Sequence, residues 1–231
     1  MPDQRGYNES EKPATIDAYH INILADDMCG LIEQSGRSRV ILIGHDWGGA
    51  VAWWLAHRNP HLLERLIIIN AAHFSVMLEH LRRDLPQRVR SWYMYFFRIP
   101  WLPEFILRRR NFKALANALI KHTRPNTFNA QEIEQYRAAW RQPGALQSMI
   151  NWYRALMRKQ PVTTQSVRIT VPTRLIWGAQ DHALGLAMAE PSIQLCDNGS
   201  LRIIQNAGHW VHREESSMVN IYIREFLAKT R

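Results

Sequence analysis

The sequence predicts an α/β protein with an N-terminally incomplete core of about four parallel strands, flanking helices and an inserted helical cap. Short, unbroken apolar runs, rich in β-branched residues, are typical of strands that are covered on both faces. Segments with helical periodicity alternate with these runs, as they do around a parallel sheet. Residues 71–171, between the second and third runs, carry no clear strand signal and look helical.

The first elements follow from local patterns. Residues 1–13 are rich in Pro, Gly, Asn and charge and are expected to form a loop. Thr15 is expected to cap a helix that runs to about Ser35, because apolar residues recur there at helical spacing. Gly36 is a fitting stop for this helix. A strand is expected at 39–43, followed by a Gly-rich turn.

The later elements repeat this alternation. A helix is expected after the turn, to about His57, with further strands at 65–70, 173–177 and 201–204 and a last helix at about 217–228. We expect the chain to divide into a first part of the core (1–72), a helical cap (73–170) and a second part of the core (171–231).

Composition limits the function classes. The chain has 231 residues, with 46% hydrophobic and 21% charged, as expected for a globular domain with a buried core. The net charge of +9 comes from scattered residues without a nucleic-acid motif, so no nucleic-acid partner is expected. No apolar run reaches the roughly 18 residues that span a bilayer, so no membrane partner is expected. Cys29 and Cys196 are isolated, which favours a cytoplasmic location.

Asp46 stands at the centre of Gly44-His45-Asp46-Trp47-Gly48. This pattern is typical of a nucleophile elbow, a turn so sharp that it needs small residues at its flanks. The elbow lifts Asp46 above the strand ends and points the N–H of Trp47 at the reacting centre. A carboxylate can attack strained or activated carbon and form an alkyl ester. The alternative is a helix-capping aspartate in a Gly-rich turn.

Asp181 and His209 complete a possible catalytic set. Asp181 ends WGAQD after the third expected strand, and His209 lies in AGHW after the fourth. Both therefore lie beyond strand carboxyl ends, where open α/β sheets bind their ligands. The order nucleophile, acid, histidine is that of α/β-hydrolases. Each residue alone is equally compatible with an ordinary turn or loop position.

Together, GHDWGG, WGAQD and AGHW resemble the epoxide hydrolase branch of the α/β-hydrolase superfamily, over essentially the whole chain. The sequence DQRGY at 3–7 is similar to a loop of that family. The resemblance implies that Asp46 is the nucleophile and that Asp181 and His209 activate water.

The resemblance also implies two lid tyrosines whose hydroxyls hold the epoxide oxygen. Tyr153, in NWYR, matches one of them, and we assign Tyr95 to the other, with Tyr93 as its close rival. Aromatic packing in the lid is the alternative for both. We assign three further residues to oxyanion stabilisation and substrate binding: Trp47, His45 and Trp210.

The chain departs from this family at its start. Relatives normally carry further strands and a His-Gly-x-Pro turn before the point where this chain begins, and no His-Gly-x-Pro occurs here. In the family, the x residue supplies a second oxyanion N–H. We therefore expect an incomplete core with an exposed strand edge, and a homodimer is one way to cover that edge.

These residues predict an epoxide hydrolase that converts a small apolar epoxide and water into a vicinal diol through an aspartyl ester. A haloalkane or haloacid dehalogenase with the same Asp-His-Asp set stays open, because the indole N–H of Trp47 can bind a leaving halide. A non-catalytic truncated remnant is the other alternative. No dinucleotide fingerprint, phosphate loop or metal-ligand spacing occurs, so no cofactor and no metal are expected.

Overall fold

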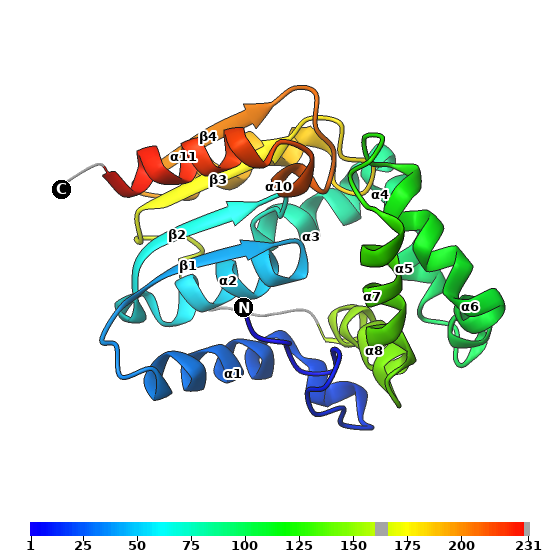
Figure 1. The fold of residues 1–231 in the computed structure, drawn as a ribbon. Helices are drawn as coiled ribbons and strands as arrows, with labels where there is room; N and C mark the ends of the chain where they lie inside the picture. The colour runs from blue at the N-terminus through cyan, green and yellow to red at the C-terminus, as the bar shows by residue number, and fades with distance from the viewer. Residues whose placement is uncertain (160–165, 229–231) are drawn as a thin grey trace. The chain divides into compact units, whose positions relative to one another are not determined.

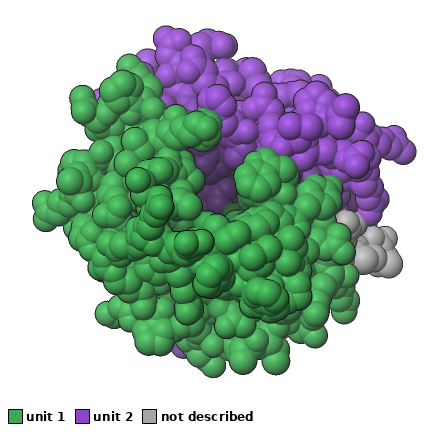
Figure 2. All heavy atoms as spheres, turned by 90° about the vertical axis from the view of Figure 1, so that its right-hand side faces the viewer, with its two compact units in different colours: residues 1–27, 92–162 green, residues 28–91, 163–231 purple. Residues whose placement is uncertain are grey.

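The computed structural model describes residues 1–159 and 166–228, in two compact units. Unit 1 comprises residues 1–27 and 92–162, and unit 2 comprises residues 28–91 and 163–231 (Figure 2). This division differs from the boundaries that we expected at residues 72 and 170. The first 27 residues cluster with the helical segment, and residues 73–91 cluster with the sheet. Residues 160–165 of the expected cap lie outside the described residues.

A parallel sheet forms the centre of unit 2 (Figure 1). Within the described residues it has four strands in the order β1 (Val40–His45), β2 (Leu63–Ile69), β3 (Thr173–Gly178) and β4 (Gly199–Ile204). All three pairings are parallel, so the four strand carboxyl ends lie along one edge of the sheet. The predicted α/β class and the four strands are confirmed, with bounds that differ by at most two residues.

Helices cover both faces of the sheet, which explains the unbroken isoleucine run of β2. Ile67 and Ile69 join an apolar cluster with Phe226 of α11 (Ser216–Ala228). Ile68 points to the opposite face, where it lies next to Gly49 of α2 (Trp47–Arg58). Because successive side chains of a strand alternate between faces, α2 and α11 lie on opposite sides of β2.

Short helices complete unit 2 between and after the strands. They are a 3-10 helix at Pro60–Leu62, α3 (Phe74–Arg83), α4 (Leu85–Arg90), a 3-10 helix at Leu186–Met188, α9 (Ala189–Gln194) and α10 (Val211–Glu214). None of the helices in the described part of the chain is long and apolar enough to cross a membrane.

The first predicted helix is interrupted. A 3-10 helix at Ile16–Tyr19 precedes α1 (Ile21–Gln34), and His20 between them has extended backbone, with ψ 141°. Thr15 does occupy the N-cap position, with extended backbone, but it precedes the 3-10 helix and its side chain makes no capping hydrogen bond. The predicted stop is confirmed: Gly36 has φ +68°, a conformation that glycine adopts without strain.

Unit 1 is helical outside its N-terminal loop. Its later helices are α5 (Trp92–Phe96), α6 (Leu102–Lys121), α7 (Ala130–Arg141) and α8 (Ala145–Arg158). Phe112, Trp140 and Ile150 belong to an apolar cluster that joins α6, α7 and α8. The backbone of α6 leaves the helical region at residues 109–112, so α6 consists of two helical segments joined at a kink.

Candidate active site

Asp46 forms the sharp turn between β1 and α2. Its backbone has φ 51° and ψ −123°, a strained conformation for a residue with a side chain. The turn leaves no room at its flank: a Cβ on Gly44 would lie 2.4 Å from the carbonyl oxygen of Gly48. Asp46 makes no side-chain capping hydrogen bond to α2, so helix capping does not explain its carboxylate.

His209 lies between two carboxylates. Its Nδ1 is 2.7 Å from Oδ2 of Asp181, and its Nε2 is 3.2 Å from Oδ1 of Asp46. The structure therefore brings together three residues that are far apart in the sequence, at the carboxyl ends of β1, β3 and β4. This is the geometry in which an acid orients a histidine and the histidine faces a nucleophile.

The carboxylate of Asp181 is buried and fully engaged. Oδ1 accepts hydrogen bonds from the backbone N–H groups of Ala183 (2.7 Å) and Leu184 (2.9 Å). Oδ2 accepts from His209 and from Nδ2 of Asn70 (2.7 Å). These four donors hold Asp181 in one orientation, so Nδ1 of His209 keeps its proton and Nε2 faces Asp46.

Asn70 is a residue that the sequence reasoning missed. It follows β2, has φ 40° and is fully buried. Its Oδ1 accepts a hydrogen bond from the backbone N–H of Gly178 (2.8 Å), while its Nδ2 donates to Asp181. Asn70 directly follows the apolar run of β2, so its place at a strand carboxyl end could have been predicted, but its bonds to Asp181 and Gly178 could not.

α4 provides a second support that no sequence pattern indicated. Arg90 donates from Nη1 to the carbonyl oxygen of Asp181 (2.8 Å). Gln87 is buried and binds the same loop twice, donating to the carbonyl of Ala183 (2.8 Å) and accepting from the N–H of Gly185 (2.9 Å). The loop that carries the acid is therefore fixed from outside the sheet.

The loop before His209 passes directly over the end of β3. A Cβ on Gly178 would lie 2.2 Å from the carbonyl oxygen of Gly208, so only glycine fits there. His45 donates from Nε2 to the carbonyl oxygen of His209 (2.8 Å). Since a carbonyl can only accept, this bond selects the Nε2–H tautomer of His45. This hydrogen bond supports the backbone of His209. The role in oxyanion stabilisation and substrate binding that we assigned to His45 from the sequence stays a prediction.

Trp210, His45 and His212 form a group of rings beside His209. The ring of Trp210 lies 5.9 Å from that of His209, edge to face, and 5.2 Å from that of His45. The ring of His212 lies 4.4 Å from that of His45. Burial, followed by the charge of His209, lowers the pKa of His45 to about 3 and that of His212 to about 4. Both rings are therefore neutral near pH 7, and His209 is the charged member of the group.

The charges of the site are strongly coupled. Burial acts to lower the pKa of His209, but the charges of Asp181 and Asp46 and their hydrogen bonds outweigh it and raise this pKa to about 10. Burial acts to raise the pKa of Asp46, but the hydrogen bond and charge of His209 bring it to about 2, with help from the N–H of Trp47. The pKa of Asp181 is also lowered, against burial, by the charge of His209. The resting site is an imidazolium between two carboxylates.

The candidate tyrosines all lie in unit 1. The ring of Tyr93 packs edge to face on that of Tyr153, with centroids 5.7 Å apart. The ring of Phe97 packs on both, at 5.8 Å from Tyr93 and 5.0 Å from Tyr153. Tyr95, by contrast, is 39% exposed. The packing favours the rival Tyr93 over Tyr95, the residue assigned from the sequence, because α5 turns the two side chains to different faces.

The acidic side chains of the site face the histidine and are not grouped around a metal position. In residues 1–159 and 166–228, no three His, Cys, Asp or Glu side chains are arranged to hold a metal ion. The carboxylates of Asp46 and Asp181 are instead engaged by His209.

Comparisons with known sequences give a consistent result. A family model described as alpha/beta hydrolase fold matches residues 1–216. The chain is 44% identical over 226 residues to the AB hydrolase superfamily protein YfhM of Bacillus subtilis, covering 98% of this chain and 79% of that protein. It is 35% identical over 231 residues to epoxide hydrolase 4 of Homo sapiens, covering 97% of this chain and 63% of that protein. The chain thus spans less than two thirds of the human relative.

Solved structures show the same likeness. An epoxide hydrolase of Bacillus megaterium in complex with an inhibitor matches with a TM-score of 0.89 and 28% identity, over 98% of this chain and 82% of that one. A structure described under novel epoxide hydrolases from metagenomes of hot environments matches with a TM-score of 0.87 and 31% identity, over 100% of this chain and 81% of that one.

Proposed function

Because this chain belongs to the α/β-hydrolase fold family, and within it to the epoxide hydrolase branch, we propose that it hydrolyses epoxides to vicinal diols. One observation carries the proposal from fold to chemistry: an aspartate occupies the nucleophile elbow and contacts a histidine that is oriented by a second aspartate. An aspartate at this position favours attack on carbon over the acyl transfer of serine esterases.

In the first step, Asp46 attacks an epoxide carbon. A bond forms between the carboxylate and that carbon, and the carbon–oxygen bond of the strained ring breaks. The pKa of about 2 keeps Asp46 ionised, so the nucleophile needs no separate base. The departing alkoxide takes a proton from a phenol, for which we propose Tyr153 and Tyr93, in place of Tyr95.

In the second step, water attacks the carbonyl carbon of the ester. Esterification removes the charge of Asp46, which is one of the influences that raise the pKa of His209, so that pKa falls in the intermediate. The proton that His209 releases replaces the one that the phenol gave to the alkoxide. Neutral His209 then takes a proton from water, and the N–H of Trp47 stabilises the oxyanion. Collapse frees the diol and regenerates Asp46.

The test is to trap the ester. His209→Gln removes the base of the second step and leaves the attacking carboxylate in place. After treatment with styrene oxide, mass spectrometry is expected to show an adduct of one substrate mass on the peptide that contains Asp46. The double variant Asp46→Ala/His209→Gln is the matched control and should carry no adduct there.

Two results would refute the mechanism: an adduct on a different peptide, or an equal adduct in the double variant. Parallel incubation with 1-chlorohexane examines the dehalogenase alternative, for which chloride release would be the sign. The names of the relatives favour the epoxide.

The phenol assignment has its own test. Tyr153→Phe and Tyr93→Phe should each slow the alkylation step by about ten- to a thousandfold, as expected for the loss of one transition-state donor. Tyr95→Phe is the matched control and should leave alkylation nearly unchanged. A large loss in Tyr95→Phe with a small one in Tyr93→Phe would make Tyr95 the donor. The cytoplasmic location inferred from the two isolated cysteines, Cys29 and Cys196, stays a prediction.

A further inference from the structure

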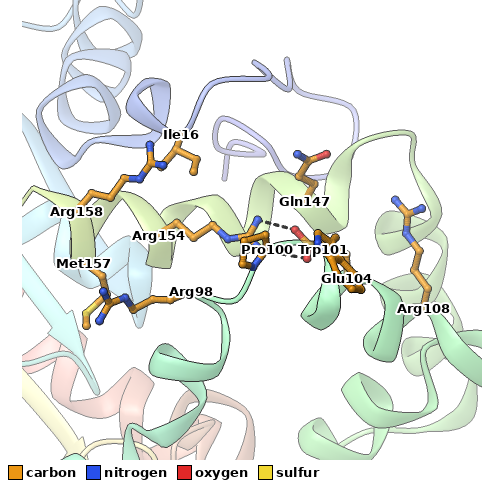
Figure 3. Close-up of a pocket in the computed structure, with 10 residues that line it drawn as sticks. All are labelled: Ile16, Arg98, Pro100, Trp101, Glu104, Arg108, Gln147, Arg154, Met157 and Arg158. Carbon is orange, nitrogen blue, oxygen red and sulfur yellow. Dashed lines mark hydrogen bonds and ion pairs between the residues drawn. The ribbon is translucent and has the colours of Figure 1, made fainter.

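A cavity of about 770 Å³ lies entirely within unit 1 (Figure 3). Its walls come from the 3-10 helix at Ile16–Tyr19, the segment 98–101, the start of α6 and one face of α8. Its volume falls in the range of about 300–1,000 Å³ that is common for small-molecule sites. No residue that we place in the catalytic reaction lines it.

A buried ion pair fixes the floor of this cavity. Arg154 donates from its guanidinium to both carboxylate oxygens of Glu104, at 2.5 and 3.1 Å. It also donates to the carbonyl oxygens of Phe97 (2.8 Å) and Ile99 (2.9 Å). Arg154 is therefore saturated and neutralised, and it anchors the segment before α6 to α8. The ion pair therefore holds the shape of the cavity, and its two charges cancel.

The remaining charges in the cavity are all positive. Arg98, Arg108 and Arg158 line it, and within residues 1–159 and 166–228 none of their guanidinium groups has a hydrogen-bond or ion-pair partner. Figure 3 shows Arg98 and Arg158 toward one end of the cavity and Arg108 toward the other. Because the carboxylate of Glu104 is paired with Arg154, it does not neutralise the three positive charges that face the cavity. Guanidinium groups favour carboxylate and phosphate as ligands, because their geometry allows paired hydrogen bonds.

Apolar side chains line the cavity beside these charges. Trp101 is 73% exposed and stands in the left-handed region, with φ 51°, at the start of α6. A bulky residue in that region is strained, and strain of this kind is often kept at ligand sites. Ile16 and Met157 add aliphatic surface to the lining. An anion without an apolar group would not contact most of this apolar surface.

We propose that this cavity binds an amphiphilic anion, a carboxylate or phosphate head group on an apolar chain. Arg98 and Arg158 hold the head group, and the chain lies over Trp101 toward Arg108. The ligand is a soluble small molecule. This site is separate from the proposed epoxide chemistry and does not depend on it.

The test uses decanoate as the probe, titrated into the purified chain by calorimetry at low ionic strength. Binding is expected, together with weaker binding as salt is added, because the head group is held by charge. Decyl phosphate should bind as well. Decanol, which lacks the charge, and acetate, which lacks the chain, should each bind at least tenfold more weakly than decanoate.

Variants locate the site. Arg98→Gln and Arg158→Gln should each weaken decanoate binding by about tenfold or more, as expected for the loss of a charge-assisted hydrogen bond. Trp101→Ala should weaken decanoate but not acetate. Arg37→Gln is the matched control, since Arg37 is exposed and outside the cavity, and it should bind like the unchanged chain. Circular dichroism checks that each variant is folded.

Several outcomes would overturn the proposal. Equal binding of decanoate by Arg98→Gln and Arg158→Gln would place the ligand elsewhere. If Arg37→Gln weakened decanoate binding equally, the effect would come from the net charge of the chain and not from the cavity. The chain could also sediment with phosphatidylglycerol vesicles in a way that depends on Arg98 and Arg158, without binding soluble decanoate. That result would mean that the ligand is a membrane surface and not a small molecule.

Discussion

The charge of His209 determines how the protein responds to alkaline pH. Its pKa in the fold is about 10, above the usual histidine value of 6.5, because two carboxylates outweigh burial. A raised pKa stabilises the fold fully below about pH 6.5, and this stabilisation is lost as the pH rises toward 10. We expect the free energy of unfolding to fall between pH 7 and 10, by up to about 1.4 kcal/mol per pH unit.

Urea denaturation at several pH values measures this slope. His209→Gln should lack it, whereas the buried thiol of Cys196, whose pKa is raised to about 11, acts in both proteins and cancels in the comparison. Parallel slopes for the two proteins would mean that His209 is neutral in the fold.

Asn70 positions the acid and is expected to affect the second chemical step only. Asn70→Gly removes the amide that binds Asp181 and the N–H of Gly178, but it also relaxes the left-handed backbone, which offsets part of the lost stability. Loss of this charge-assisted bond should slow ester hydrolysis by about ten- to a hundredfold, with alkylation little changed. Asn70→Asp, which sets a second carboxylate against Asp181, should be worse.

Single-turnover kinetics separate the two steps. A merely structural role for Asn70 would lower both rates together, or would lower the melting temperature without changing either rate.

These residues differ in how far the sequence alone predicts them. Asp46, Asp181 and His209 stand in local motifs at strand ends, so their positions could be predicted without knowing the sheet order. Asn70 and Arg90 act through partners that are 111 and 91 positions away, and no local pattern encodes those distances. The choice between Tyr93 and Tyr95 depended on which face of a five-residue helix is packed, which so short an element does not reveal.

Among the structural elements, the elbow between β1 and α2 tolerates the least change. Gly44→Ala would place a Cβ 2.4 Å from backbone atoms that cannot move without opening the turn. We expect a loss of several kcal/mol, at least as large as about 1–3 kcal/mol for an overpacked core. Gly30→Ala is the matched control, because nothing lies within 4 Å of its Cβ and alanine favours α1. It should raise the melting temperature, and a similar fall for both variants would contradict the packing argument.

The sheet was easier to predict than the helices. Strands covered on both faces are continuous apolar runs, and those of β1, β2 and β3 are unmistakable. The break at His20 and the kink at 109–112 come from local backbone conformations that leave the helical periodicity of the sequence almost intact.

At the scale of the whole molecule, the sheet edge at β1 is expected to promote self-association. Within the described residues β1 pairs only with β2, and its Ile41 and Ile43 are 41% and 48% exposed. Apolar strands at an edge can pair with a second chain. Light scattering after size exclusion should show a mass that rises with concentration.

Ile43→Lys should weaken this association, because a lysine at an edge opposes strand pairing. Ile221→Lys is the control, since Ile221 is 40% exposed on α11, outside the edge strand. A monomer at all concentrations, or equal effects of the two lysines, would rule out pairing through β1.

The order of the strands also has a consequence for how the molecule folds. Partners in β1 and β2, or in β3 and β4, lie close together in the chain, whereas Leu66 of β2 pairs with Thr173 of β3 across the whole helical insertion. Closing the longer loop costs about 1–2 kcal/mol more conformational entropy, so this pairing is the natural late event of folding. Asp46 belongs to one side of that junction and Asp181 and His209 to the other. A partly folded chain can therefore hold both halves of the sheet and still have no catalytic centre.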